Sequence, residues 1–219
     1  VKNLLKLKSA SNIYICLSFD VPRPKSLQAE ENLKHIVSAI SFVRSVNKFS
    51  GIRIEAAGKD SAVLKELGGR LSNETKLPLD SENGDLVIRI RLEPTGLDKK
   101  ATRKWEVLVR TTPRPLSIRD WKKKDYPGAI NPVIAFSILK LLNIKEEDSI
   151  INSMCGSGTF LAELYENFKF KEATGIDISK NALEIAHVNC ENAKNKIQLA
   201  EADATSLPFE NNAFNIGVT

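Results

Sequence analysis

The sequence predicts an α/β protein built from two parts. Residues 12–111 alternate short strands with two amphipathic helices, which is typical of a mixed α+β unit. Residues 131–218 alternate strands of about five residues with helices of ten or more, which is typical of βαβ units around a parallel sheet. Between them, residues 112–128 carry three prolines and a glycine without periodicity, which favours a linker.

In the first part, alternating apolar residues from Ile13 to Phe19 predict a strand over residues 12–19. Apolar residues spaced three and four apart predict a helix within residues 26–47. The same spacing predicts a helix that Asp60 caps and that runs to Leu71. Alternation predicts three further strands, over residues 51–56, 86–92 and 105–111.

In the second part, the pattern predicts helices and strands in strict alternation until the last two strands. The helices are expected over residues 131–142, 159–168 and 179–193. The strands are expected over residues 149–152, 173–177, 196–201 and 214–218. Consecutive parallel strands place their carboxyl ends at one edge of the sheet, so loops far apart in the chain meet there.

The charge is polarised along the chain. Residues 1–125 carry 25 Lys and Arg against 15 Asp and Glu, whereas residues 126–219 carry 7 against 12. The densest basic stretch is residues 99–124. This asymmetry favours a polyanionic partner for the first half, although basic side chains that merely solubilise the surface give the same pattern, and charge does not separate nucleic acid from anionic lipid.

Several classes of protein are disfavoured. The apolar runs are far shorter than the ~20 residues of a membrane-spanning helix, and the first residues lack the apolar core of a signal peptide. Three cysteines without CxxC spacing predict free thiols and no zinc or other metal site. We therefore expect a cytoplasmic protein.

The segment that carries chemistry is residues 149–159, a strand that runs into a glycine turn and opens a helix. Gly156 and Gly158 permit a tight turn, and the helix start offers unpaired N–H donors. A dinucleotide site has a third glycine where this chain has Leu161. Asp177 ends the next strand and Asp203 follows the one after. Glycine, acid and acid at one sheet edge favour a nucleoside ligand without phosphates.

Each of these features has a plainer explanation when taken alone. A GxG turn is common, Asp177 alone is more often a helix cap, and Asp203 alone is a turn residue. Only their joint spacing favours a ligand site. Cys155 is expected to pack under the turn without a reactive role, because nothing nearby lowers a thiol pKa.

Three segments of the second part carry a family resemblance. They are Asn152-Ser-Met-Cys-Gly-Ser-Gly-Thr-Phe-Leu-Ala-Glu163, Gly175-Ile-Asp-Ile-Ser179 and Ala202-Asp-Ala204. They resemble the S-adenosylmethionine-binding motifs of THUMP-domain RNA guanine-N2 methyltransferases. Residues 52–60, 107–116 and 126–132 resemble the RNA-binding THUMP segment and its junction in that family. One departure is Asn152-Ser153, where many relatives have Asp-Pro.

The resemblance implies an arrangement of domains. It implies a ferredoxin-like strand and a THUMP RNA-binding region over residues 1–114 and a linker over residues 115–128. Residues 129–219 are then the N-terminal half of a Rossmann-like class I methyltransferase domain, whose C-terminal half is absent from the sequence.

The resemblance also implies site residues. The turn from Met154 to Thr159 would hold the methionine end of S-adenosylmethionine, Asp177 the ribose, and Asp203 with Ala204 the adenine. The full cofactor set is Ala129, Asn131, Pro132, Met154, Cys155, Gly156, Ser157, Gly158, Thr159, Asp177, Ile178, Asp203 and Ala204. The RNA-binding set is Arg53, Lys59, Arg110, Arg114, Arg119, Lys122, Lys123 and Lys124.

The implied reaction is methyl transfer to the exocyclic N2 amine of a guanosine in tRNA, with ribosomal RNA as the nearest alternative. The family's catalytic Asn or Asp and its proline-rich aromatic motif follow the fourth strand, just beyond Thr219, so no catalytic residue is expected within these residues. We therefore expect the isolated 219 residues to bind without turnover. Two alternatives stay open, a nicotinamide-dependent oxidoreductase, against which Leu161 argues, and a non-catalytic RNA-binding protein.

Overall fold

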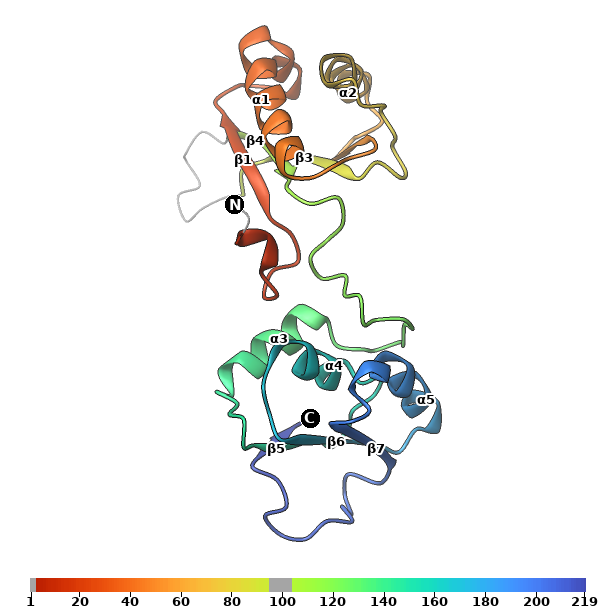
Figure 1. The fold of residues 1–219 in the computed structure, drawn as a ribbon. Helices are drawn as coiled ribbons and strands as arrows, with labels where there is room; N and C mark the ends of the chain where they lie inside the picture. The colour runs from red at the N-terminus through yellow and green to blue at the C-terminus, as the bar shows by residue number, and fades with distance from the viewer. Residues whose placement is uncertain (1–2, 95–103) are drawn as a thin grey trace. The chain divides into compact units, whose positions relative to one another are not determined.

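A computed structural model describes residues 3–94 and 104–219 of the chain (Figure 1). Contacts divide the chain into two compact units, and each is described by itself. The first runs to Leu116, and the second comprises Ser117–Thr219 together with Lys8–Ser11. Part of the basic stretch, residues 99–103, lies outside the described residues. Among the described residues, no helix has both the length and the apolar character needed to cross a bilayer.

Within its described residues, the first unit contains four strands and two α-helices. Helices α1 (Glu30–Val46) and α2 (Ala62–Thr75) lie on one face of the sheet (Figure 1). The strands are β1 (Tyr14–Phe19), β2 (Ile52–Ala56), β3 (Leu86–Leu92) and β4 (Trp105–Arg110), with short 3₁₀ turns at Leu4–Lys6 and Pro24–Gln28. The sheet order is β1-β4-β3-β2. Strand β2 pairs in parallel with β3, and the other pairs are antiparallel, so the sheet is mixed.

Alternation along the strands decides which side chains enter the core of the first unit. Ile52 and Ile54 of β2 pack with Ile88 and Ile90 of β3 and with the apolar stripes of the helices. The intervening residues, such as Arg53 and Glu55, face away from that core because neighbouring side chains of a strand point to opposite faces. The predicted elements are therefore present, with shifted ends: helix α2 has Ser61 as its N-cap, not Asp60, and runs to Thr75, not Leu71, and β1 begins at Tyr14.

The second unit contains a parallel sheet with helices α3 (Pro132–Leu141), α4 (Thr159–Asn167) and α5 (Lys180–Asn189) on one face (Figure 1). The strands are β5 (Ser149–Asn152), β6 (Glu172–Asp177), β7 (Ile197–Glu201) and β8 (Ile216–Val218). The expected helix over residues 179–193 is shorter, because α5 ends at Asn189 and a 3₁₀ turn, Glu191–Ala193, follows.

The order of the second sheet is β7-β6-β5-β8, and every pair is parallel. The chain moves outward from β5 to β7 and then returns to the other side of β5. The strand order therefore reverses at β5, and ligands of open α/β sheets bind beside the carboxyl ends of strands at such a reversal. The turn after Asn152 lies at this point.

Candidate functional site

The turn between β5 and α4 is built on two glycines in the left-handed region. Gly156 has φ +52° and Gly158 has φ +80°, conformations that other residues rarely adopt. A Cβ at Gly158 would lie 2.9 Å from the Sγ of Cys190, so this glycine lets α4 approach α5 closely. A Cβ at Gly156 would meet nothing within 4 Å. The backbone at Gly156 is thus open to the approach of a ligand.

Asp177 joins the end of β6 to this turn. Its Oδ2 accepts a hydrogen bond from the backbone N–H of Gly156 at 2.8 Å, and its Oδ1 accepts one from the N–H of Ser179 at 2.9 Å. The backbone N–H of Cys155 also donates to the carbonyl of Ile176 at 2.8 Å. The structure therefore brings the glycine turn and the first acidic residue together, as their spacing predicts.

Asp203 follows β7 at the same edge of the sheet. The N–H of Ala202 donates to the carbonyl of Asp177 at 3.2 Å, which ties the two strand ends together. Oδ1 of Asp203 accepts from the N–H of Thr205 at 2.8 Å and from its hydroxyl at 2.7 Å. The Thr205 N–H lowers the pKa of Asp203, and the hydroxyl adds to this effect. Asp203 is thus an exposed carboxylate held by a turn.

Exposed apolar and buried polar groups flank the turn. Met154 is 61% exposed and Ile178 is 70% exposed, so both offer apolar surface beside the turn. Within the described part of the chain, the buried Oγ of Ser157 and the buried Oδ1 of Asn152 have no hydrogen-bond partner. The exposed side chains beside the turn are therefore apolar, and the base of the turn contains buried polar atoms that can still form hydrogen bonds. This combination suits a ligand with apolar and polar parts.

The residues expected to close over the cofactor begin helix α3. Asn131 caps this helix, because its Oδ1 accepts from the N–H of Val133 at 2.9 Å. Pro132 is buried at the first helical position, and α3 packs along α4. The N–H of Ala129 donates to the carbonyl of Tyr126 at 3.1 Å. Their contact with a cofactor stays a prediction.

The two buried cysteines near the turn are not nucleophiles. Burial raises the pKa of Cys155 to about 12, and the charge of Asp177 adds to this. Burial likewise raises the pKa of Cys190 to about 12. Both thiols are therefore protonated at neutral pH and act as small packed side chains, since the thiolate is the reactive form.

Residues 117–125, which we call the basic strap, dock on the second unit although the sequence favoured a linker there. Arg119 donates from Nε to the buried Oε1 of Glu163 at 2.6 Å, and the indole of Trp121 donates to the same oxygen at 2.9 Å. Lys123 pairs with Glu191 at 2.6 Å. An aperiodic proline-bounded segment gives no sign of such docking. The one available signal was Glu163, an acidic residue inside an apolar helical run.

Two of the predicted RNA-binding arginines serve the fold instead. The side chain of Arg119 is 3% exposed in its pair with Glu163. Arg110 is buried and donates to the carbonyls of Thr112 at 2.9 Å, Asp85 at 3.0 Å and Pro113 at 2.6 Å. Burial lowers its pKa. Their expected place among phosphate-binding groups is corrected, because buried and hydrogen-bonded guanidinium groups cannot reach a polyanion.

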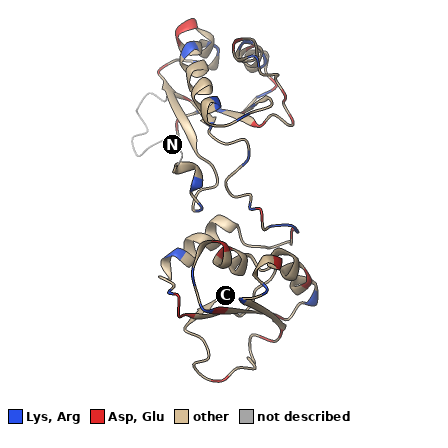
Figure 2. Ribbon diagram, in the orientation of Figure 1, with Lys and Arg blue, Asp and Glu red and all other residues tan. Residues whose placement is uncertain are grey.

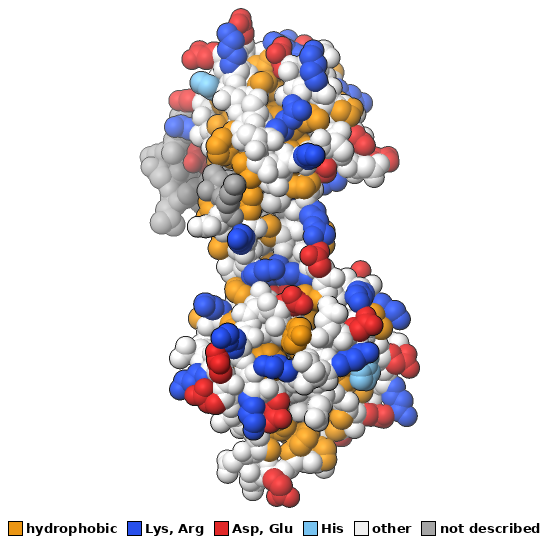
Figure 3. Space-filling view, in the orientation of Figure 1, with side chains coloured by type: hydrophobic (Ala, Val, Ile, Leu, Met, Phe, Trp, Pro, Cys, Tyr) orange, Lys and Arg blue, Asp and Glu red, His pale blue; other side chains and the backbone are white. Residues whose placement is uncertain are grey.

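The other predicted cations are divided between the two units (Figure 2). In the first unit, Arg53 pairs with Glu55 at 3.3 Å, and Lys59 is exposed after β2. Arg114 is exposed after β4. In the second unit, Lys122 pairs with Asp125, and Lys124 is exposed. On the second unit Figure 3 shows basic and acidic side chains interspersed, so no single-sign patch marks the face in view.

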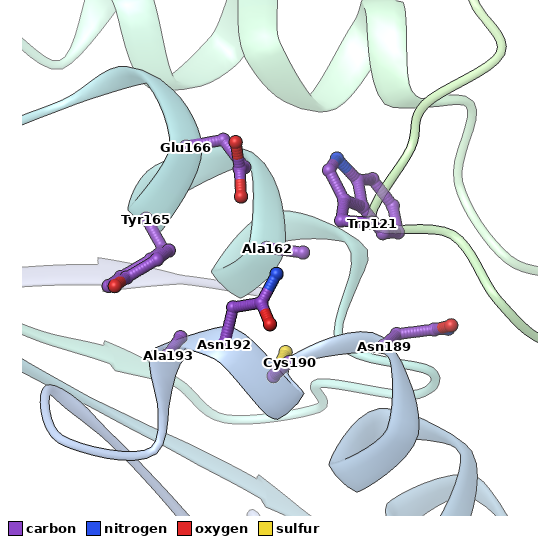
Figure 4. Close-up of a pocket in the computed structure, with 8 residues that line it drawn as sticks. All are labelled: Trp121, Ala162, Tyr165, Glu166, Asn189, Cys190, Asn192 and Ala193. Carbon is purple, nitrogen blue, oxygen red and sulfur yellow. The ribbon is translucent and has the colours of Figure 1, made fainter.

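A shallow pocket lies between the basic strap, helix α4 and the end of α5 (Figure 4). Its lining residues are Trp121, Ala162, Tyr165, Glu166, Asn189, Cys190, Asn192 and Ala193. None of them belongs to the predicted cofactor set. The open backbone of Gly156 and the carboxylates of Asp177 and Asp203 lie at the glycine turn instead, which stays the candidate cofactor site.

Comparison with known families finds a match for part of the second unit. Residues 150–219 match the model of the family described as "Methyltransferase domain". The second unit contains a methyltransferase domain. The match begins in β5 and includes the glycine turn, Asp177 and Asp203, and it favours methyl transfer over the nicotinamide-dependent alternative.

Curated relatives match the same region. A demethylmenaquinone methyltransferase of Staphylococcus saprophyticus is 30% identical over 95 residues, which are 39% of this chain and 40% of the relative. The corresponding protein of Staphylococcus epidermidis is 28% identical over 95 residues, 39% of each chain. The chain spans about two fifths of the length of these relatives.

Solved structures resemble both units in fold. TrmN from Thermus thermophilus has a TM-score of 0.65 at 20% identity. The match covers 95% of this chain and 61% of the TrmN chain. A protein described as a predicted N6-adenine-specific DNA methylase from Listeria monocytogenes has a TM-score of 0.62 at 13% identity. The match covers 97% of this chain and 66% of the Listeria protein. The predicted α/β class is confirmed, with a mixed sheet followed by a parallel sheet of the Rossmann-like class I methyltransferase type.

The methyltransferase domain uses S-adenosylmethionine as its cofactor, and the residues present fit that molecule. Gly156 has open space above its backbone, Ile178 and Met154 offer apolar surfaces, and Ser157 carries an unpartnered hydroxyl within the described residues. These groups suit an adenosine that carries a sulfonium and a polar amino-acid end.

Proposed function

We propose that the protein is an S-adenosylmethionine-dependent RNA methyltransferase that modifies the N2 amine of a guanosine in tRNA. The observation that carries the proposal is the contact of Gly156 with Asp177 at the strand reversal of a methyltransferase domain. This contact joins an open backbone turn to a carboxylate, the two groups that a nucleoside cofactor needs.

Each part of the cofactor finds a chemically suited group. The Asp177 carboxylate suits the ribose hydroxyls, and the neighbouring Ile178 offers an apolar surface for a planar base. The turn from Met154 to Thr159 suits the methionine end, since α4 begins there without a side-chain cap and the first N–H groups of a helix have no partner within the helix. When bound, the cofactor supplies an electrophilic methyl group.

The choice of RNA as substrate rests on charge and on the family resemblance. Residues 1–125 carry the excess of positive charge, and Lys59, Arg114 and Lys124 are exposed on the surface of the protein. Phosphate contacts position a nucleic acid without reading its sequence. The fold likeness to TrmN extends over both units, so the first unit, which carries the basic excess, is part of the shared fold.

The reaction makes a specific demand on the site. The guanine amine attacks the methyl carbon, the carbon–sulfur bond breaks, and the amine releases a proton. Its lone pair is delocalised into the ring, so a positioned acceptor must orient the amine and take that proton. The resemblance assigns this task to an Asn or Asp shortly after β8, whose last residue, Val218, lies beside Asn152 of β5.

The test has two steps. Calorimetric titration with S-adenosylhomocysteine and, separately, NADH should give binding of the first alone, and preferential NADH binding would contradict the cofactor assignment. Tritiated methyl transfer to unmodified tRNA, followed by nucleoside analysis, should then place the label on N2-methylguanosine. Label on N6-methyladenosine would overturn the guanosine assignment. The transfer assay uses the whole natural polypeptide.

A further inference from the structure

Asn189 lies at the end of α5 and is 4% exposed. Its Oδ1 accepts hydrogen bonds from the backbone N–H groups of Lys123 and Lys124, both at 3.0 Å. Its Nδ2 donates to the carbonyls of Lys124 and Ser157, both at 3.1 Å. A primary amide has two donors and two acceptor positions, so Asn189 uses its full capacity. It bridges the basic strap and the glycine turn.

The bridge acts on the most adjustable part of the turn. Ser157 lies between Gly156 and Gly158, which both adopt left-handed conformations. Because glycine has no Cβ, the backbone on both sides of Ser157 can change conformation more easily than elsewhere. The peptide group between Ser157 and Gly158 is held on both sides. Its carbonyl accepts from Asn189, and its N–H donates to the carbonyl of Cys155 at 2.9 Å. Asn189 therefore helps to fix the orientation of the turn.

The strap end of the bridge is equally constrained. Lys123 and Lys124 present their backbone to Asn189, while the Nζ of Lys123 pairs with Glu191 just beyond α5. Trp121 is fixed to Glu163 of α4 and lines the pocket that Asn189 also lines (Figure 4). A shift of the strap backbone must therefore break the hydrogen bonds of Asn189 or move its side chain.

We propose that Asn189 is a positioning residue that couples the basic strap to the cofactor turn, so that binding of RNA at Lys123 and Lys124 and binding of cofactor at the turn strengthen one another. The proposal rests on the proposed function, which counts Lys124 of the strap among the phosphate-binding groups and assigns the cofactor to the turn. Thermodynamic linkage makes the effect reciprocal: RNA raises the affinity for cofactor by the same factor as cofactor raises the affinity for RNA.

The informative substitution is Asn189→Asp, because it removes both hydrogen bonds that Asn189 donates and keeps both that it accepts. The carboxylate keeps the size of the side chain and still accepts from the two lysine N–H groups, but it cannot donate to the carbonyls of Ser157 and Lys124, so its only bond to the turn is lost. The matched control is Asn192→Asp, which makes the same change at an exposed residue of the same pocket.

Trp121 reports on the strap. The chain has two tryptophans, and Trp105 belongs to β4 of the first unit, so a Trp105→Phe background leaves Trp121 as the sole indole. Titration with S-adenosylhomocysteine should change the Trp121 emission in this background and in the Asn192→Asp control. Asn189→Asp should bind at least about tenfold more weakly and abolish that change, while the emission of the free protein stays the same.

A second readout is the coupling itself. The affinity for S-adenosylhomocysteine, measured with and without unmodified tRNA, should rise about fivefold or more with tRNA in the wild type and stay constant in Asn189→Asp. Equal affinity and equal emission change in Asn189→Asp and wild type would overturn this proposal alone. So would a wild type that binds S-adenosylhomocysteine without any change at Trp121. Failure of the wild type to bind it would overturn the proposed function as well.

Discussion

Asp177 Oδ2 accepts the backbone N–H of Gly156 at 2.8 Å, across 21 positions of the sequence. This bond holds the glycine turn against the end of β6. It also holds the carboxylate where it has a second backbone donor, Ser179, and stays half-buried at the edge of the sheet. One residue thus shapes the turn and offers an anionic group to a ligand.

Removal of the Asp177 carboxylate should therefore weaken cofactor binding sharply. We expect Asp177→Ala to lower the affinity for S-adenosylhomocysteine about 10- to 100-fold, because a charged hydrogen-bonding group and the anchor of the turn are lost together. RNA affinity measured without cofactor should stay the same. Calorimetry measures the affinity for S-adenosylhomocysteine, and filter binding measures the affinity for RNA. Glu184→Ala, at an exposed residue of α5, is the control. An equal loss of RNA affinity would contradict the division of roles.

The two glycines of the turn should respond differently to alanine. Gly156→Ala places a methyl group in open space, so the free energy of unfolding should fall only by the left-handed strain of about 1–2 kcal/mol, while the ligand approach is blocked. Gly158→Ala adds a clash with Cys190 to the same strain and should destabilise by a further ~1–3 kcal/mol. Urea unfolding and S-adenosylhomocysteine binding of the two variants check this. Equal stability of the pair would refute the packing argument.

Neutralisation of Lys122, Lys123 and Lys124 to glutamine should weaken RNA binding and leave cofactor affinity in the absence of RNA unchanged. The slope of log affinity against log salt concentration should fall by about 2 to 3, because each phosphate contact contributes just under one unit. The backbone N–H groups that bind Asn189 survive these substitutions. A variant that loses Lys140, Lys145 and Lys194 removes the same charge elsewhere in the second unit. If both triple variants lose RNA affinity equally, net charge and not the strap is responsible.

Glu163 should be the stability anchor of the basic strap. It is fully buried and accepts from Arg119 and Trp121, so Glu163→Ala removes the carboxylate that a buried guanidinium and an indole share and should lower the free energy of unfolding of the second unit by about 3–5 kcal/mol. Exposed Glu166 of the same helix offers the control, for which Ala should change stability by less than about 0.5 kcal/mol. Urea unfolding followed by Trp121 emission measures both. A small effect at Glu163 would mean that the strap is held by other contacts.

The sequence alone determined the order of the elements and the local chemistry of the turn. Strands β3 and β5 begin and end where alternation predicts, and Gly156, Gly158 and Asp177 lie together as their spacing implies. These features depend on contacts between close neighbours in the chain or on the regular βαβ repeat. Periodicity and turn chemistry record both directly.

Only the tertiary structure decided which cations remain available and how the basic strap is held. Arg119 and Glu163 are 44 positions apart, and Asn189 contacts the strap from 65 positions further along the chain. In the sequence, Arg119 and Arg110 are indistinguishable from solvent-facing basic residues, because a side chain's charge says nothing of its burial. Burial and pairing depend on long-range packing, in which a buried charge is tolerated only beside a specific distant partner.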